Sequence, residues 1–570
     1  MSDDFEVTGT NDAALFTLKL HRGEGMLLLA MNWKTSTPPD NFVGFAIEYQ
    51  EPGRSRFFTL NNRLSFTPGT ATVHPSQQNP TTACPIQKFR WVHFPRNAEK
   101  RGLFTYRVTP VFMDSADQLS HGEPQQASLE LRRETYPGAL NVAFTRGFVS
   151  SQAFVDRYGK DSVPTLYPDN ADEGLTFVPT NPQEDDALTW MGFEARSAIL
   201  EVLDQAIADP SAQVRVIAYD LNEPHIVSRL EQLQGRLRVI IDDSPDHSAS
   251  TSAESQAEDR LRASAGTGNV RRQHMRDLQH NKIIVVDGQA GQRVVCGSTN
   301  FSWRGCYVQN NNAVVLHGPG PVAVFARAFD SYWPNAPAAF SRTPSAVMQP
   351  LGISGVDAQV AFSPHSPANA LLATVADDLR SATSSLFYSL AFLGQTKKGP
   401  IRKAITDITE DDSVFVYGIA DQRVTGINLQ EPGGNRQPVH PSQLSGDVPP
   451  PFSEEPSGGK GIRMHHKFAV IDFSLPTARV YLGSYNFSQP ADVDNGENLL
   501  LIRDRRIAVS YMVEALRIFD HYQFRLLQGA AGASRALALT RPPRNPGEVP
   551  WWRKDYTDPV RIRDRELFSR

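Results

Sequence analysis

Two short stretches each place a histidine and a lysine two residues apart at the start of an apolar run. The first is LQHNKIIVVD at residues 278–287, and the second is GIRMHHKFAVID at residues 461–472. Both contain the pattern H-x-K-x4-D. Side chains two apart in a strand point to the same face, so each stretch should present an imidazole beside an ammonium group. This combination suits nucleophilic or acid–base chemistry on an anion.

A Gly-Ser-x-Asn turn follows each stretch after one further strand, in RVVCGSTNFS at 293–302 and RVYLGSYNFS at 479–488. Glycine permits a close backbone approach, and serine and asparagine supply neutral hydrogen-bond donors. If the two copies face each other about a pseudo-twofold axis, they form one phosphate site with a histidine on either side. One imidazole could then attack phosphorus while the other protonates the leaving oxygen, with no metal required.

The two stretches belong to a larger internal repeat. NVAFT at 141–145 is echoed by QVAFS at 359–363, and each is followed by helical and apolar strand patterns in the same order. This order predicts two α/β halves whose strands are buried on both faces. Before Tyr136, short runs such as FVGFAIEYQ at 42–50 are spaced as in an antiparallel β-sandwich. The predicted domains are a sandwich at 1–135, a first half at 136–347, and a second half with a C-terminal tail at 348–570.

The duplicated H-x-K-x4-D with G-S-x-N resembles the phospholipase D superfamily from about residue 140 to the end of the chain. LFTYRVTPVFMD at 103–114 resembles the last strands of a fibronectin type III domain, with Phe104 where such domains often have tyrosine. The first resemblance implies two pseudo-twofold-related α/β/α halves, a phosphohistidine intermediate, and neither cofactor nor metal. It places catalytic residues at His280, Lys282, Asp287, Ser298 and Asn300, and at His465, Lys467, Asp472, Ser484 and Asn486.

The two halves differ at one position that could distinguish the histidines. Aligning NNNAVVL with GENLLLI puts Asn311 opposite Glu497. The resemblance implies that this residue hydrogen-bonds the far nitrogen of the catalytic histidine in its own half. A carboxylate partner favours imidazolium, and an amide partner leaves the ring nearer neutral. We therefore expect His280, paired with Asn311, to attack phosphorus, and His465, paired with Glu497, to donate the proton and later activate water.

Composition limits the alternatives. The formal charge of −5 gives no global attraction to nucleic acid or anionic lipid. The acidic start lacks a signal-peptide pattern, and no apolar run is long enough to span a bilayer, so we expect a cytoplasmic protein without stable membrane insertion. The three cysteines lack the spacing of a zinc or redox site.

The motif identifies a phosphodiester as the substrate without identifying the molecule. GSYNFSQPADVDNGENLLLI at 483–502 resembles small bacterial nucleases of the superfamily, and VRRQHMR at 270–276 could follow a phosphate backbone. These features slightly favour nucleic acid over a phospholipid, the alternative being phospholipid hydrolysis or transphosphatidylation. An inactive binding scaffold is disfavoured, because no motif position is lost.

Three further segments lead to expectations about the rest of the chain. Irregular insertions at about 243–272 and 421–460 should border the site and tune substrate choice. The sandwich could dock a protein partner. The tail segment PWWRKDYTDPV at 550–560 should fasten the C-terminus onto a core.

Overall fold

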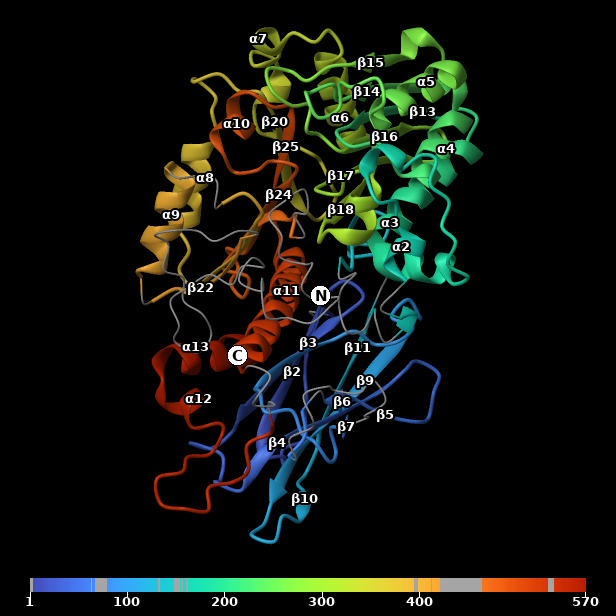
Figure 1. Ribbon diagram of the computed structural model, residues 1–570. Coiled ribbons are helices and arrows are strands. Elements are labelled where there is room, and N and C mark those ends of the chain that lie inside the picture. The colour runs from blue at the N-terminus through green and yellow to red at the C-terminus, as the bar shows by residue number, and fades with distance from the viewer. Residues whose placement is uncertain are drawn as a thin grey trace.

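The computed structural model describes most of the 570-residue chain and shows a β-sandwich beside two α/β lobes (Figure 1). The described residues are 4–62, 64–66, 79–131, 134–147, 154, 157–159, 162–393, 398–411, 413–420, 464–531 and 538–570.

The N-terminal part is the predicted antiparallel sandwich. Burial alternates along its strands, as in Leu103–Met113, where Phe104, Tyr106 and Val108 are buried and the residues between them are less so. One sheet has the order β1 (Glu6–Thr8), β2 (Phe16–Arg22), β3 (Leu27–Trp33) and β8 (Arg90–His93). The other has the order β10 (Leu119–His121), β9 (Leu103–Met113), β4 (Phe42–Gln50) and β5 (Phe58–Thr59), with β11 (Gln125–Glu130) also paired to β9. β6 (Asn61–Asn62) and β7 (Asn79–Pro80) form a separate small pair.

Each α/β lobe is built on a seven-stranded mixed sheet, and six strands recur in the same order in both. The first sheet has the order β12 (Leu140–Phe144), β18 (Asn312–His317), β17 (Gln292–Gly297), β16 (Ile283–Asp287), β13 (Gln213–Ala218), β14 (Leu237–Ile241) and β15 (Val270–Arg272). The second has the order β19 (Gln349–Pro350), β20 (Asp357–Ser363), β25 (Glu497–Arg503), β24 (Arg479–Gly483), β23 (Lys467–Ile471), β21 (Ser385–Leu390) and β22 (Phe415–Ile419). The predicted internal repeat is therefore present.

Helices cover both faces of the sheets, which confirms the α/β class. A central apolar core joins the facing sides of the two sheets to α6 (Pro319–Tyr332) and α11 (Arg505–Ala531). Separate cores cover the other sides. The first-half core contains residues of α3 (Glu184–Ala208), α4 (Pro224–Gln232) and α5 (Ala253–Ala265), and the second-half core contains residues of α8 (Leu372–Arg380) and α9 (Pro400–Thr409). Short helices are α2 (Val163–Leu166), α7 (Pro337–Phe340), α10 (Gln489–Val493), α12 (Lys554–Thr557) and α13 (Pro559–Ser569).

The C-terminal tail returns to the sandwich, as the paired tryptophans predicted. Trp552 is 1% exposed within the sandwich core. Trp551 stacks on Phe89 with ring centroids 5.2 Å apart and donates from Nε1 to the Phe42 carbonyl oxygen at 3.0 Å. The tail and the N-terminal sandwich therefore form one packed unit.

The first predicted insertion is not irregular. Residues 243–272 contain α5 and the edge strand β15, which pairs in parallel with β14. The second insertion, 421–460, lies outside the described residues. None of the helices in the described ranges combines the length and apolar character needed to cross a membrane.

Candidate active site

The two histidines of the repeated motif lie side by side. Their ring centroids are 6.4 Å apart, with the rings inclined at 71°. At this separation, one phosphate group between the rings lies within reach of both imidazoles. His280 and His465 are 3% and 4% exposed. Their spacing therefore fits one phosphate group, as the shared-site prediction requires.

Each histidine is partnered by the opposite half, so the expected pairing within each half is wrong. His280 Nδ1 lies 2.8 Å from Glu497 Oε2, and His465 Nδ1 lies 2.8 Å from Asn311 Oδ1. The alignment itself is correct. Gly297 pairs with Ala313 and Gly483 with Leu499, so Asn311 and Glu497 occupy equivalent positions two residues before these partners.

Backbone contacts between the halves explain the crossing. The amide of His465 donates to the Asn310 carbonyl at 3.1 Å, and the amide of Gly496 donates to the Leu278 carbonyl at 2.8 Å. Asn310 precedes Asn311, and Gly496 precedes Glu497. These backbone bonds therefore hold each partner residue beside the histidine of the other half. The sequence motifs alone carry no signal for this interlocking.

The hydrogen bonds define the state of each imidazole. Both partners of Nδ1 are acceptor oxygens, so each ring donates from Nδ1 and, when neutral, has its lone pair on Nε2. Burial lowers the pKa of His280, although the Glu497 carboxylate opposes the shift. Burial and the charge of Lys467 hold the pKa of His465 well below its usual value. Both rings are therefore neutral near pH 7 without a bound anion.

The lysines supply the positive charge predicted for the site. Lys467 Nζ donates to His465 Nε2 at 2.9 Å, and Lys282 Nζ donates to the His280 carbonyl oxygen. Both lysines are 1% exposed. Burial lowers the pKa of Lys282 to about 8, and burial together with repulsion from Lys282 holds the pKa of Lys467 well below its usual value. Buried ammonium groups are costly unless paired, so an anion between them would be stabilised.

The Gly-Ser-x-Asn residues act in different ways. Ser298 Oγ donates to Asn311 Oδ1 at 2.9 Å, the same oxygen that binds His465, so Ser298 positions this partner. Both serine hydroxyls also accept from a backbone amide of the following strand, Ser298 Oγ from Asn312 and Ser484 Oγ from Asn498, each at 3.0 Å. Asn300 Nδ2 donates to Asp220 Oδ2 at 2.7 Å. The side-chain oxygens of Asn300 and Asn486 are both buried without a hydrogen-bond partner among the described residues.

The motif aspartates do not belong to the site, which corrects their predicted catalytic role. Asp287 is exposed at the far end of β16, five residues and roughly 16 Å along the strand from Lys282, and accepts from Gln292 Nε2 at 2.9 Å. Asp472 is buried and accepts from the amides of Thr383, Ser384 and Ser385 at 2.7–3.1 Å. It therefore holds the turn between α8 and β21.

Two residues that sequence reasoning missed pack against the histidines. The Tyr219 ring meets the His280 ring edge-on at 4.7 Å and lies 4.7 Å from Lys282 Nζ. On the opposite side, the Phe392 ring lies 6.1 Å from His465. Both follow the strand next to each H-x-K strand, so that position was the available signal. The strand registers show that Asp220 in the first half and Phe392 in the second half occupy equivalent positions. The first half therefore has a carboxylate where the second half has an apolar ring.

The basic run at 270–276 is largely engaged with the protein. Arg272 Nη1 binds Glu258 Oε2 at 3.1 Å, and Arg276 Nη1 donates to the Val493 carbonyl oxygen at 3.1 Å. The guanidinium of Arg271 lies 4.5 Å from the Trp333 ring centroid. These contacts reduce the charge available to a nucleic acid backbone.

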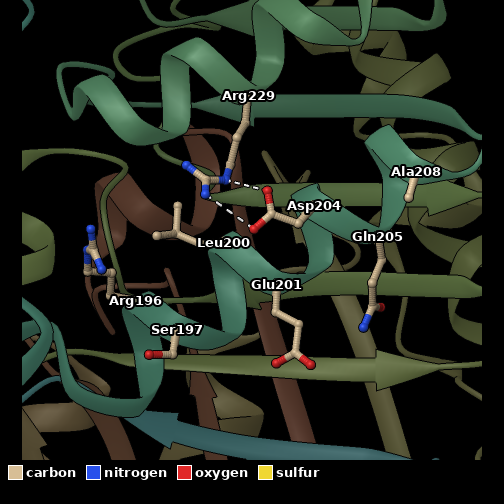
Figure 2. A pocket seen from close by; sticks show the side chains of 8 residues that line it. All are labelled: Arg196, Ser197, Leu200, Glu201, Asp204, Gln205, Ala208 and Arg229. Carbon is tan, nitrogen blue, oxygen red and sulfur yellow. Dashed lines mark hydrogen bonds and ion pairs between the residues drawn. The ribbon is translucent and has the colours of Figure 1, made fainter.

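A surface hollow lies along α3 (Figure 2). It is lined by residues that include Arg196, Glu201 and Gln205, and Arg229 forms an ion pair with Asp204 at 2.7 Å on its wall. It contains no residue of the repeated motif, so it is not part of the candidate active site.

Comparison with known proteins gives matches to both halves. Residues 203–333 and 379–519 match the family model described as "Cardiolipin synthase, PLD-like domain". A 59-residue stretch is 41% identical to the mitochondrial cardiolipin hydrolase of Xenopus tropicalis; it makes up 10% of this chain and spans about a quarter (26%) of that relative.

Two solved structures are also similar. Phosphatidylserine synthase of Haemophilus influenzae Rd KW20 is 12% identical with a TM-score of 0.39, covering 66% of this chain and 93% of that one. The phospholipase D family member Nuc of Salmonella typhimurium is 20% identical with a TM-score of 0.17, covering 30% and 96%.

Proposed function

The chain belongs to the phospholipase D superfamily, and from this premise we propose that it cleaves a phosphodiester by double displacement without a catalytic metal ion. The observation that carries the proposal is the pair of buried histidines 6.4 Å apart, each flanked by a lysine. Attack from one side and departure on the other is the geometry of in-line displacement at phosphorus.

His280 is the proposed nucleophile. Among the described residues its hydrogen bonding is confined to Nδ1, which leaves the Nε2 lone pair available. The lone pair of His465 is instead occupied by Lys467. When His280 attacks, its ring becomes a cation, and the Glu497 carboxylate at Nδ1 stabilises that charge. The proposed roles match those expected from the sequence, but the physical reason is different, since the carboxylate belongs to the nucleophile.

His465 is the proposed acid and base. Burial and the lysine charges lower the pKa of His465, and because an anionic diester offsets the lysine charges, we expect this ring to take up a proton at Nε2 as substrate binds. In the first step the N–P bond forms at His280, the P–O bond to the leaving group breaks, and His465 gives its proton to the leaving oxygen. In the second step water attacks phosphorus, His465 takes a proton from that water, and the N–P bond breaks to restore neutral His280.

The roles can be tested with a nitrophenyl phosphodiester, whose leaving group needs no proton. His465→Ala should release nitrophenol in a single burst and accumulate a phosphoryl adduct on His280, detectable by peptide mass spectrometry. His280→Ala should give neither burst nor adduct. The exposed His274, which pairs with Asp243, provides a control through His274→Ala. An adduct found on His465 in the otherwise wild-type protein would reverse the roles.

For the substrate we propose a phospholipid diester, with nucleic acid as the second candidate. The matching family model and the curated relative are both named for cardiolipin. The sequence slightly favours nucleic acid, through the nuclease-like stretch 483–502 and the basic run, but two of the run's arginines, Arg272 and Arg276, bind protein groups.

A substrate panel in EDTA tests this choice. Cardiolipin-containing vesicles, phosphatidylcholine vesicles, single-stranded DNA, duplex DNA and RNA should be compared for the wild type, with His280→Ala as the blank. We expect turnover of the cardiolipin-containing vesicles above this blank. Turnover of DNA or RNA alone would select the second candidate, and an absolute requirement for added metal would contradict the proposed chemistry.

A further inference from the structure

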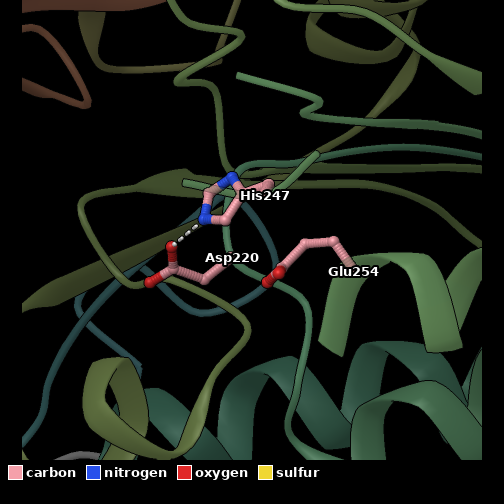
Figure 3. Close-up of side chains that lie close together, drawn as sticks. All are labelled: Asp220, His247 and Glu254. Carbon is pink, nitrogen blue, oxygen red and sulfur yellow. Dashed lines mark ion pairs between the residues drawn. The ribbon is translucent and has the colours of Figure 1, made fainter. Parts of the chain in front are cut away.

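A histidine and two carboxylates converge beside the candidate active site (Figure 3). Asp220 follows β13, His247 lies in the loop after β14, and Glu254 is in the first turn of α5. One ligand atom from each lies within 4.8 Å of the others. We propose that Asp220, His247 and Glu254 bind one divalent transition-metal ion, with Zn²⁺ as the best fit, at a site that positions the wall of the active site. This site goes beyond the proposed function and does not depend on it.

The spacing fits coordination better than a direct ion pair. His247 Nε2 lies 3.3 Å from Asp220 Oδ1. Charge-assisted hydrogen bonds are usually about 2.7–2.9 Å long. Two ligands about 2.0–2.1 Å from a tetrahedral zinc ion are separated by about 3.3–3.4 Å, which matches the distance between His247 Nε2 and Asp220 Oδ1. One imidazole nitrogen with carboxylate oxygens suits zinc, whereas calcium and magnesium favour oxygen ligands alone.

The imidazole is oriented as in a metal site. His247 Nδ1 lies 2.8 Å from Asp242 Oδ2, which leaves Nε2 directed toward Asp220. Asp242 is completely buried and accepts from the amides of Ser244 at 2.9 Å and Gln279 at 2.6 Å. A carboxylate that fixes the far nitrogen of the ligating histidine is the usual outer shell of a zinc site.

Both carboxylate ligands are also fixed. The second oxygen of Asp220, Oδ2, accepts from Asn300 Nδ2 at 2.7 Å, and Glu254 Oε1 accepts from the Leu221 amide at 3.0 Å. With Asp242, three carboxylates lie around one imidazole, and a protonated His247 and the ammonium group of Lys282 together balance only two of them. Buried charges of this kind are paired or coordinate metals. A divalent ion would reduce the surplus.

The cluster is joined to the catalytic groups. The Tyr219 ring lies 4.6 Å from His247 on one side and 4.7 Å from His280 on the other. A metal ion would therefore restrain Asp220, Asn300 and Tyr219 together. It would act on position, since the proposed displacement uses only the histidines and lysines.

Metal binding to the full chain can be measured without any substrate. After chelator treatment and dialysis, the protein should bind one equivalent of Zn²⁺ by calorimetry, and Co²⁺ should give the visible absorption of a tetrahedral site. Zn²⁺ should also raise the thermal midpoint. We expect Glu254→Gln and Asp220→Asn each to weaken Zn²⁺ binding at least tenfold.

The nearby exposed pair His274 and Asp243 supplies the matched control, because it offers a histidine and a carboxylate outside the cluster. His274→Gln should leave Zn²⁺ affinity within twofold of the wild type. No saturable binding by the wild type would overturn the site. If Glu254→Gln and Asp220→Asn both bind Zn²⁺ with the affinity of the wild type, the ion lies elsewhere and the proposed site is also overturned. Because the readout is binding, either outcome is independent of whether the phosphodiesterase proposal holds.

Discussion

Glu497→Gln isolates the charge that the structure places behind the proposed nucleophile. Glutamine has nearly the same shape and still offers an oxygen to His280 Nδ1, which lies 2.8 Å from the carboxylate. The variant therefore removes the negative charge while keeping the tautomer and orientation of the ring. Any loss of rate then reports electrostatic stabilisation of the cationic imidazole.

The magnitude follows from the geometry. The charge on a phosphorylated imidazole is spread over the ring, about 4 Å from the carboxylate, and unit charges at this distance interact by about 4 kcal/mol at an effective dielectric constant of 20. If about half of the charge has developed in the transition state, the loss is about 2 kcal/mol. This corresponds to roughly a 30-fold slower formation of the phosphoryl-enzyme.

Stopped-flow measurement of the nitrophenol burst tests this value, since that phase reports the attack alone. Asn311→Asp is the matched variant, because it places a carboxylate behind His465 instead of His280. Departure of the acidic nitrophenol does not need a proton from His465. It should change the burst less than threefold. If Glu497→Gln also changes the burst less than threefold, or Asn311→Asp slows it as much, His280 is not the nucleophile that the carboxylate serves.

Three other outcomes are expected. Because burial lowers the pKa of Lys282 to about 8, its positive charge is lost as the pH rises through 8. Sulfate has a constant charge in this range, so calorimetry should show that it binds progressively more weakly between pH 7 and 9.5. A constant sulfate affinity would contradict this. Asp287→Asn should leave turnover within twofold of the wild type, and a large loss of turnover would return that residue to the site. Asp472→Asn should lower the free energy of unfolding, measured by denaturant titration, by about 1.5–3 kcal/mol. Trp552→Ala should destabilise the sandwich by about 3–5 kcal/mol, seen as a lower thermal midpoint, and an unchanged midpoint would show that the tail contributes little.

The fold and the central pair of histidines could be predicted from the sequence because the repeat supplied two independent copies of one pattern. His280, Lys282, His465 and Lys467 follow directly from the period of a strand, and they converge as expected. The same period also sends Asp287 away from the site, since five residues carry it to the other end of β16. Motif membership is therefore a weaker guide to position than strand geometry.

Contacts between the halves could not be predicted in the same way. The partner of His280 is set by backbone hydrogen bonds that join residues about 200 positions apart, such as Gly496 to Leu278, and no local pattern specifies them. The cluster around His247 was missed for a related reason. Its three members have no regular spacing, and His247 and Glu254 lie in the region 243–272, which was predicted to be irregular rather than to contain α5.

The return of Trp552 to the sandwich has a consequence for synthesis on the ribosome. The last sandwich strand, β11, ends at Glu130, but the tryptophan that completes this core lies in the C-terminal tail. At about 5–20 residues per second, the roughly 420 residues between them take about 20 to 80 seconds to emerge. During that interval Phe89 and Phe42 lack their contacts with Trp551, the neighbour of Trp552, so the part of the chain that is made first is among the last to reach its final packing.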